Sequence, residues 1–342
     1  MRRLKQRLRV THADTERGAV GVLVAVMMLV IIGAGALAVD VGQIYSERAQ
    51  LQNGADAGAL GVAQACHKAG CTQAEAEAFA AALANGNAND GDANISEVDL
   101  SVPDQVTVRT TTKNGSSSVL AKLFSSVLDA PAVSVGAHAT ASIEVPGSGG
   151  GFPLALSECQ YDLSDAVETG VLQRIRYKPG MAGCTSTSGH AIPGGFGWLD
   201  QNGGQCRATT DVDDNAAYDP GADYPSKPGQ NCDAVLQGWI NSIQAGDEVL
   251  GVFPVFDNAG KDKGKGWFHI RGYATFQMVG WKFGGGSSGP RTYNNSPTPA
   301  TACVDPCRGI IGKFKKFESI DAFEGNSGTG DDLGTVYIRL TN

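Results

Sequence analysis

The pattern of apolar and polar positions changes sharply at Asp40. From Ala19 to Val39 the chain carries no charged side chain and no strongly polar one. A helix rises about 1.5 Å per residue, so this run spans roughly 32 Å, enough to cross a hydrocarbon core about 30 Å thick. The pattern therefore predicts a transmembrane helix over 19–39, preceded by a short tail at 1–18.

Beyond Asp40 the apolar positions recur in steps of three and four residues, which is the stripe of an amphipathic helix. They are Val41, Ile44, Tyr45, Leu51, Ala55, Ala59, Val62 and Ala65. We therefore expect the membrane helix to continue beyond the bilayer for about 25 residues. Gly54, Gly58 and Gly61 lie in this extension, and such small residues let another backbone approach closely. The face predicts lateral packing with other subunits or, alternatively, packing on the protein's own first domain.

Residues 40–145 are expected to form one α+β domain, in which this long helix packs on a small sheet. A second helix begins with Thr72 as N-cap and ends at the breaker Asn85-Gly86-Asn87. Three segments of alternating polarity predict strands, at Ile95–Val102, Val106–Thr110 and Ala132–Val145. The glycine- and serine-rich segment 146–151 is typical of a flexible linker.

Residues 152–342 predict a second, mainly β domain rich in glycine, aromatic residues and cysteine. Four segments have strand character, at Val249–Phe256, Trp267–Val279, Arg308–Phe317 and Thr335–Thr341. One amphipathic helix is expected at Asp233–Ile243. The predicted fold class of the whole chain is therefore α+β.

The eight cysteines all follow the predicted membrane span, at Cys66, Cys71, Cys159, Cys184, Cys206, Cys232, Cys303 and Cys307. Outside the cytoplasm cysteines persist as disulfides, so we expect a disulfide-stapled exterior. The first two and the last two are close enough in sequence for local bridges. The middle four allow three connectivities, which the sequence leaves open. A zinc site is the alternative, although the spacings are wide and no CxxC is present.

Charge sets the expected orientation of the chain. Basic side chains are concentrated before the apolar run, at Arg2, Arg3, Lys5, Arg7, Arg9 and Arg17. By the positive-inside rule, Met1 is cytoplasmic and everything after Asp40 is extracellular. Asp40 itself lies at the outer boundary of the span, where its charge can reach the lipid headgroups. Alternatively, Asp40 is only a stop-transfer residue that marks the end of the membrane span. The alternative is a cleaved signal peptide, because Ala36-Leu37-Ala38 has the small-x-small form of a cleavage site.

The net charge of −8 gives no support to nucleic-acid binding, which needs positive charge along the contact surface. One weak calcium candidate is the spacing Asp211-x-Asp213-x-Asn215. The glycine and the glutamate that a calcium loop needs are replaced by Ala216 and Ala222, so a solvated acidic loop is the alternative. We expect no cofactor.

The other candidates for chemistry are weak. His190 and His269 suggest catalysis, but no GxSxG surrounds any serine, and His269 alternates with apolar neighbours as a strand residue does. The four tryptophans form either a ligand surface or, as we expect, part of the core; they are Trp198, Trp239, Trp267 and Trp281. The sequence predicts no catalytic centre.

After the apolar run come "AVDVG" at 38–42 and "LQNGADAGAL" at 51–60, in this order and spacing. In these features the N-terminal segment resembles the TadE/TadG-like Flp pilus-assembly proteins. The resemblance covers about 50 residues; the second domain resembles, more loosely, extensions on actinobacterial members. The sequence departs from the pattern of this family in two places. Leu23 stands where a prepilin-peptidase site after Gly18 would have glutamate, and the chain has no metal-binding DxSxS motif.

What the resemblance implies is a non-catalytic minor pilin or assembly factor of a tight-adherence pilus. Its first domain would be pilin-like, and its partners would be the lipid bilayer and other pilin or Tad-system membrane components. Two rival functions remain open: an anchored extracellular module that binds a ligand for adhesion, and a secreted enzyme.

Overall fold

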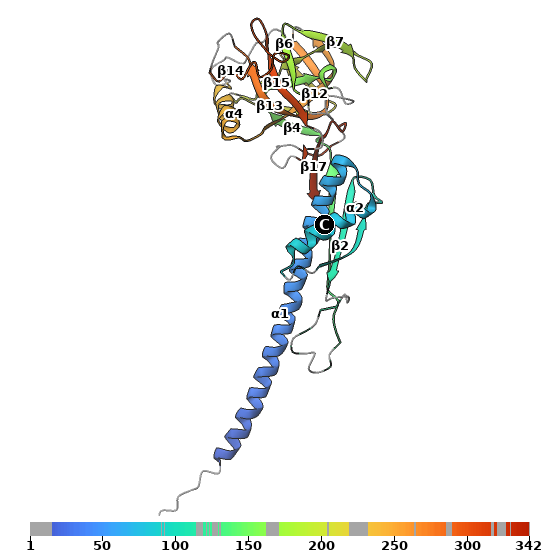
Figure 1. Ribbon diagram of the computed structural model, residues 1–342, viewed down its shortest axis with the longest axis vertical. Helices are drawn as coiled ribbons and strands as arrows, with labels where there is room; N and C mark the ends of the chain where they lie inside the picture. Colours follow the sequence, from blue (N-terminus) through green and yellow to red (C-terminus); the bar gives the residue numbers. More distant parts are fainter. Residues whose placement is uncertain are drawn as a thin grey trace, which may run out of the picture. The chain divides into compact units, whose positions relative to one another are not determined.

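The computed structural model describes residues 16–341 except for internal gaps. These gaps are 90, 92, 114–118, 121, 123, 125–128, 130, 162–170, 204, 219–231, 263–264, 285–288, 316–317, 320–325 and 329. Residues 1–15, most of the predicted basic tail, lie outside the described residues. The elements are α+β, as predicted (Figure 1).

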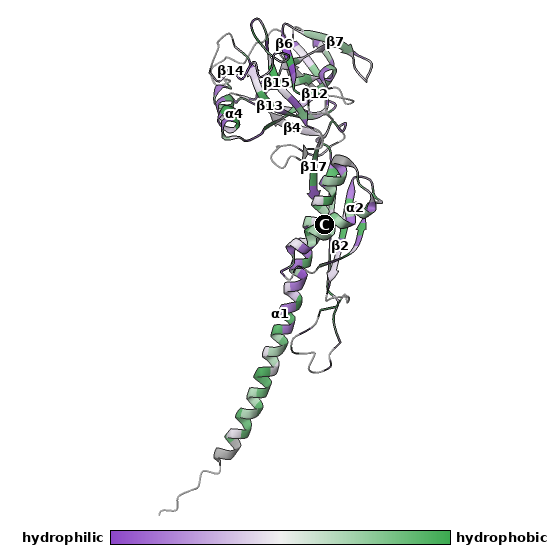
Figure 2. Cartoon of the chain, viewed as in Figure 1, coloured by the Kyte–Doolittle hydropathy of each residue, from purple (hydrophilic) through white to green (hydrophobic). Residues whose placement is uncertain are grey.

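Helix α1 (Glu16–Ala69) is a single helix of 54 residues. It joins the apolar run to the striped extension without interruption, which confirms the predicted continuity (Figure 2). The helix ends where Gly70 adopts a positive φ of 68° and its amide donates to the carbonyl of Cys66 at 2.8 Å. A left-handed residue just past a helix end is glycine's usual role, because it carries no Cβ to clash.

Helix α2 (Gln73–Asn87) starts with a capping box. The Thr72 amide donates to the Glu75 carboxylate at 2.8 Å, and the Glu75 amide donates to the Thr72 hydroxyl at 3.3 Å. Each hydrogen bond satisfies a donor that the first turn of a helix leaves without a partner. Hydrogen bonds from the Thr72 amide and hydroxyl lower the pKa of Glu75. Both predicted ends of this helix are confirmed.

The first sheet has five strands in the order β1-β2-β3-β17-β16. Their bounds are β1 (Ala93–Asp99), β2 (Gln105–Thr112), β3 (Gly136–Glu144), β17 (Thr335–Leu340) and β16 (Glu318–Ser319). The predicted hairpin and third strand are present. However, β17 pairs antiparallel with β3, Tyr337 opposite Glu144, so the last strand belongs to the sheet that β1 begins. The prediction assigned that strand to a separate domain, because strand pairing across the chain leaves no local signal.

Helix α1 packs on α2 and the sheet through a small apolar core. Leu51 is buried with Ala84, Ala93 and Val135. The Thr110 hydroxyl donates to the Leu51 carbonyl at 2.9 Å, which ties β2 to the helix. Small residues lie where the two helices meet, because Ala55 and Ala59 of α1 and Ala80 and Ala84 of α2 are all buried.

The segment predicted as a flexible linker contains strand β4 (Ser148–Gly151), which pairs with β10 (Ala208–Asp211). Its glycines serve close packing. A Cβ on Gly147 would lie 2.4 Å from the Cα of Gly328, and one on Gly150 would lie 2.5 Å from Nε of Arg207. Glycine-rich composition suits both a flexible linker and a tightly approached strand, and here the strand is what forms.

The largest sheet has the order β6-β15-β13-β12-β5-β9, with β11 and β14 also paired to β13. Its strands are β5 (Leu154–Ser157), β6 (Gln173–Lys178), β9 (Phe196–Trp198), β11 (Asn215–Tyr218), β12 (Val249–Asp262), β13 (Lys265–Lys282), β14 (Thr292–Tyr293) and β15 (Arg308–Lys315). Around it lie η2 (Glu158–Gln160), α4 (Asp233–Ala245) and the hairpin of β7 (Met181–Thr185) and β8 (Ala191–Gly194). The predicted helix and the strands at β12, β13 and β15 are confirmed.

Aromatic side chains fill the core of this sheet. Trp198 and Trp281 are buried with Phe253 and Phe276, and Trp239 is partly buried against them. Trp198 lies edge-on to Phe283, with ring centroids 5.2 Å apart. Trp198, Trp239 and Trp281 therefore pack in this core, as expected, whereas Trp267 is half-buried and lies outside it.

The eight cysteines form four pairs. They are Cys66–Cys71, Cys159–Cys184, Cys206–Cys232 and Cys303–Cys307. Both local bridges are as predicted, and the structure selects one of the three connectivities for the middle four. A disulfide that closes a loop of about 25 residues stabilises a fold by roughly 3 kcal/mol. The Cys159–Cys184 and Cys206–Cys232 bridges are therefore expected to stabilise the part of the chain that follows residue 152.

Candidate functional site

The first half of α1 is apolar on every side and exposed on every side. A window within Val20–His67 has a mean hydropathy of 2.9 and none of it is buried inside the protein. Leu29 and Ile31 are typical, at 73% and 69% exposed. A helix that is apolar all round must be covered by something other than water. Among the described residues this is the one helix long and apolar enough to cross a membrane, and it fits a membrane anchor.

The predicted small-residue face lies farther along α1. A Cβ on Gly54 would lie 3.2 Å from the Cα of Ala84, and one on Gly58 would lie 3.2 Å from Cγ1 of Val108. Both glycines are buried, whereas Gly61 is half-buried. The chain's own α2 and β2 therefore cover Gly54 and Gly58, which is the alternative that the sequence left open.

Replacing Gly58 with leucine is expected to destabilise the first domain by about 1–3 kcal/mol, because the added side chain overpacks the contact with Val108 and Ala80. Urea unfolding of the full chain in detergent, followed by circular dichroism, measures the change. Gly42→Leu is the matched control, since Gly42 lies on the same helix and nothing approaches its Cβ position within 4 Å. Equal stability of the two variants would contradict internal packing of this face.

Asp40 lies where the apolar run ends, but its side chain does not extend into solvent. It is 3% exposed, and its Oδ1 accepts a hydrogen bond of 3.0 Å from the backbone amide of Phe124. Phe124 itself is 48% exposed. The sequence suggested a boundary charge at Asp40, and it gave no indication that a residue 84 positions away would cover it.

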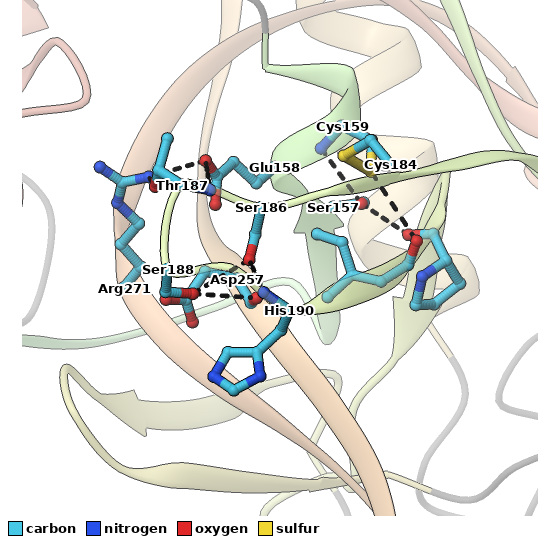
Figure 3. Close-up of a disulfide and its surroundings, with 12 residues drawn as sticks. Ser157, Glu158, Cys159, Cys184, Ser186, Thr187, Ser188, His190, Asp257 and Arg271 are labelled. Carbon is cyan, nitrogen blue, oxygen red and sulfur yellow. Dashed lines mark hydrogen bonds and ion pairs between the residues drawn. A yellow bond between two sulfur atoms is a disulfide. The ribbon is translucent and has the colours of Figure 1, made fainter.

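A polar cluster surrounds the Cys159–Cys184 bridge (Figure 3). Nδ1 of His269 lies 2.8 Å from Oδ1 of Asp257, which is buried. Burial opposes ionisation of Asp257, but its hydrogen bonds with Ser188 and His269 prevail and lower the pKa of the carboxyl group. The Ser188 hydroxyl donates to the carbonyl of Asp257 at 3.4 Å. In the described part of the chain Ser188 bonds to Asp257, whereas the serine of a catalytic triad bonds to the histidine.

Beside this cluster, Arg271 joins three elements. Its Nη1 lies 2.8 Å from Oε1 of Glu158 and also contacts the Thr187 hydroxyl (Figure 3). Its Nε contacts the carboxylate of Asp331. The Thr187 amide also donates to Oε1 of Glu158 at 3.0 Å. The contacts link η2, the β7–β8 turn and β13, and their arrangement indicates a structural ion pair.

The calcium candidates lie in the turn between β10 and β11. Asp211 ends β10, Asn215 begins β11, and Asp213 adopts a positive φ of 63° while its amide donates to the carbonyl of Ile270 at 2.9 Å. Within the described part of the chain, no three His, Cys, Asp or Glu side chains are grouped to hold a metal ion. Through this hydrogen bond the turn is attached to β13. Calcium binding by its acidic side chains stays a weak prediction.

A cavity of about 530 Å³ lies beside the end of β3. Its polar lining includes His67, Asp104, Glu144 and Asp332, with Nε2 of His67 3.8 Å from Oδ2 of Asp332. Aliphatic side chains, among them Val336, complete the wall. The excess of carboxylates would suit a cationic group on an aliphatic stem. No motif in the sequence pointed to this cavity.

The long helix, apolar at its base and packed on α2 and β2 above, is also the part of the chain that is similar to known proteins. Residues 18–65 match the family model of putative Flp pilus-assembly TadE/G-like proteins. No curated protein matches the chain, and no solved structure does.

This TadE/G-like segment, residues 18–65, covers nearly all of α1 (Glu16–Ala69). It therefore includes both the exposed apolar half and the half that packs on α2 and β2. The match connects the N-terminal helix with pilus assembly, as the resemblance implied. The β-rich region that follows lies outside the matched residues.

Proposed function

We propose that this chain is a membrane-anchored minor pilin or assembly factor of a Flp/Tad-type pilus, without a catalytic centre. The observation that carries the proposal is the division of the TadE/G-like segment into two halves of one continuous helix. The first half offers apolar side chains on all sides, and the second is fixed to its own domain by Leu51, Gly54 and Gly58. Such a helix holds a folded domain at a set distance from a bilayer.

The proposed orientation places the N-terminus in the cytoplasm and the bulk of the chain outside the cell. Basic side chains before the span support this, because they are retained on the cytoplasmic side. The four cysteine pairs support it too, because disulfides persist in oxidising compartments. The chain's proposed partners are the lipid bilayer and other pilin or Tad-system membrane components. Since α2 and β2 cover Gly54 and Gly58, the exposed half of α1 is the better surface for lateral contacts with those partners.

Fractionation of cells that express the full chain tests this proposal. Alkaline carbonate is expected to leave the protein in the membrane pellet, and protease added to intact cells is expected to digest the portion beyond Tyr45.

Deleting the gene in a piliated host is expected to abolish pili, and the wild-type gene should restore them. Leu29→Arg, which puts a charge at the centre of the span, costs about 2.5–3.5 kcal/mol of insertion free energy and should reduce membrane retention.

Phe79→Arg is the matched control, because Phe79 is exposed on α2, away from the span. Release of the wild-type chain by carbonate would contradict the anchor, and full protease protection in intact cells would contradict the proposed orientation. Pili that persist without the gene would contradict the assembly role. In that case the carboxylate-lined cavity would favour the second candidate, an anchored binding module for a cationic ligand.

A further inference from the structure

The residues next to the end of the apolar run form a second feature suited to a bilayer. Val39 is the last residue of that run, and Asp40 follows it directly. The hydrocarbon core is about 30 Å thick and the run is of similar length, so Asp40 lies at the hydrocarbon boundary when α1 spans. This step rests on the proposed membrane anchor.

A carboxylate at that boundary is costly unless hydrogen bonds satisfy it. The amide of Phe124 supplies one, at 3.0 Å from Oδ1, and Asp40 is almost fully buried. The main chain of Phe124 is therefore held against α1 at the level where the apolar run stops. The contact gives a physical reason for the main chain of Phe124 to lie beside the helix.

Two aromatic side chains lie exposed at this level. The ring of Phe124 is about half exposed although its main chain is held by Asp40. Tyr45, at 70% exposed, stands five residues farther along α1, about 7.5 Å beyond Asp40. At 100° per residue, Tyr45 projects from a different side of the helix than Asp40, so the two rings flank α1 on separate sides. Aromatic residues are enriched where hydrocarbon meets the headgroups.

We propose that Phe124 and Tyr45 form an interfacial collar that inserts into the outer surface of the lipid bilayer. The collar would fix the height of the first domain above the membrane, with Asp40 as the positioning residue that holds Phe124 in place. The bilayer is the expected occupant because the collar continues directly from the exposed apolar face of α1. Neither ring needs a protein partner to be covered at that depth.

Single-cysteine labelling of the full chain tests the collar. All eight native cysteines are paired, so a cysteine introduced at position 124 is the only free thiol. Phe124→Cys labelled with the environment-sensitive fluorophore NBD is reconstituted into phosphatidylcholine–phosphatidylglycerol vesicles. We expect blue-shifted emission, and loss of emission when the lipids carry a nitroxide near the headgroup. Adding Asp40→Ala should shift the emission at 124 to the red and remove its quenching by the lipid nitroxide, because residue 124 loses its hydrogen bond to α1.

Two further positions calibrate the result. Leu29→Cys marks the centre of the span and should be quenched by nitroxides deep in the acyl chains. Phe79→Cys is the matched aromatic control: Phe79 is exposed and adjoins Ala80, whose Cβ lies 3.7 Å from the Cβ position of Gly58. Gly58 is 18 residues along α1 from Asp40, about 27 Å, so the label at 79 should stay in water and escape quenching.

The outcomes separate the two proposals. A label at 29 that no lipid nitroxide quenches overturns the membrane anchor itself. A label at 29 that is quenched, with one at 124 that is not, overturns only the collar. Blue-shifted emission at 124 without lipid quenching also overturns it, because protein and not lipid would then cover the ring.

Discussion

A chain cut after Gly334, which lacks β17, is expected to lose the fold of the five-stranded sheet. The strand buries Val336, Tyr337 and Ile338, and removing them forfeits roughly 5–8 kcal/mol of apolar burial at about 1.5–3 kcal/mol per side chain. The cut also deprives the Thr275 hydroxyl of its 2.8 Å hydrogen bond with Thr335. Single domains are stable by about 5–15 kcal/mol, so the loss is comparable to the whole.

Limited proteolysis and thermal unfolding of the full and truncated chains in detergent measure this effect. A cut after Leu340, which removes two residues and leaves β17 intact, is the matched control and should behave nearly as the full chain does. If the chain cut after Gly334 resisted protease as well as this control, β17 would not be an integral strand.

Arg271→Met is expected to lower the free energy of unfolding of the domain that contains residues 152–342 by about 3–5 kcal/mol. The change leaves the carboxylate of Glu158, 11% exposed, without its cation, and an uncompensated buried charge is costly. The side chain of Arg271 is itself only 18% exposed, so solvent screens the pair weakly. Urea unfolding gives the change in the free energy of unfolding.

Arg109→Met provides the comparison. Its partner Glu97 lies 2.8 Å away, but both side chains are about half exposed, so the expected loss is about 0.2–1 kcal/mol. The double variant Arg271→Met with Glu158→Gln should recover much of the stability, because no unpaired charge remains. Equal losses at Arg271 and Arg109 would mean that the Glu158 pair contributes no more than a surface pair.

Sequence patterns predicted what depends on neighbouring residues. The apolar run and its stripe give α1, the Thr72–Glu75 spacing gives the start of α2, and alternation gives β1, β2 and β12. Each of these signals lies within one element. For the candidate site, the same local signal located the exposed apolar helix and the small residues within it.

Long-range partners could not be predicted in this way. The pairing of β17 with β3, the Asp40–Phe124 contact and the Cys159–Cys184 bridge join residues that have no shared local pattern. The glycines at 147 and 150 were ambiguous, because their composition does not reveal what backbone or side chain comes close. Likewise, the sequence showed that Gly58 permits close approach but not that β2 would be the neighbour.

The return of β17 to the sheet of β3 also has a mechanical consequence. Glu144 and Tyr337 stand opposite each other in that sheet, so the chain between them starts and ends at adjacent strands. Tension on the β12–β13 hairpin therefore reaches α1 along one covalent path, through β3, and along the hydrogen bonds that pair β17 with β3. A domain attached only through one peptide would be released by a single cleavage, whereas after a cut between Glu144 and Ser148 the pairing of β17 with β3 would still hold the cleaved portion.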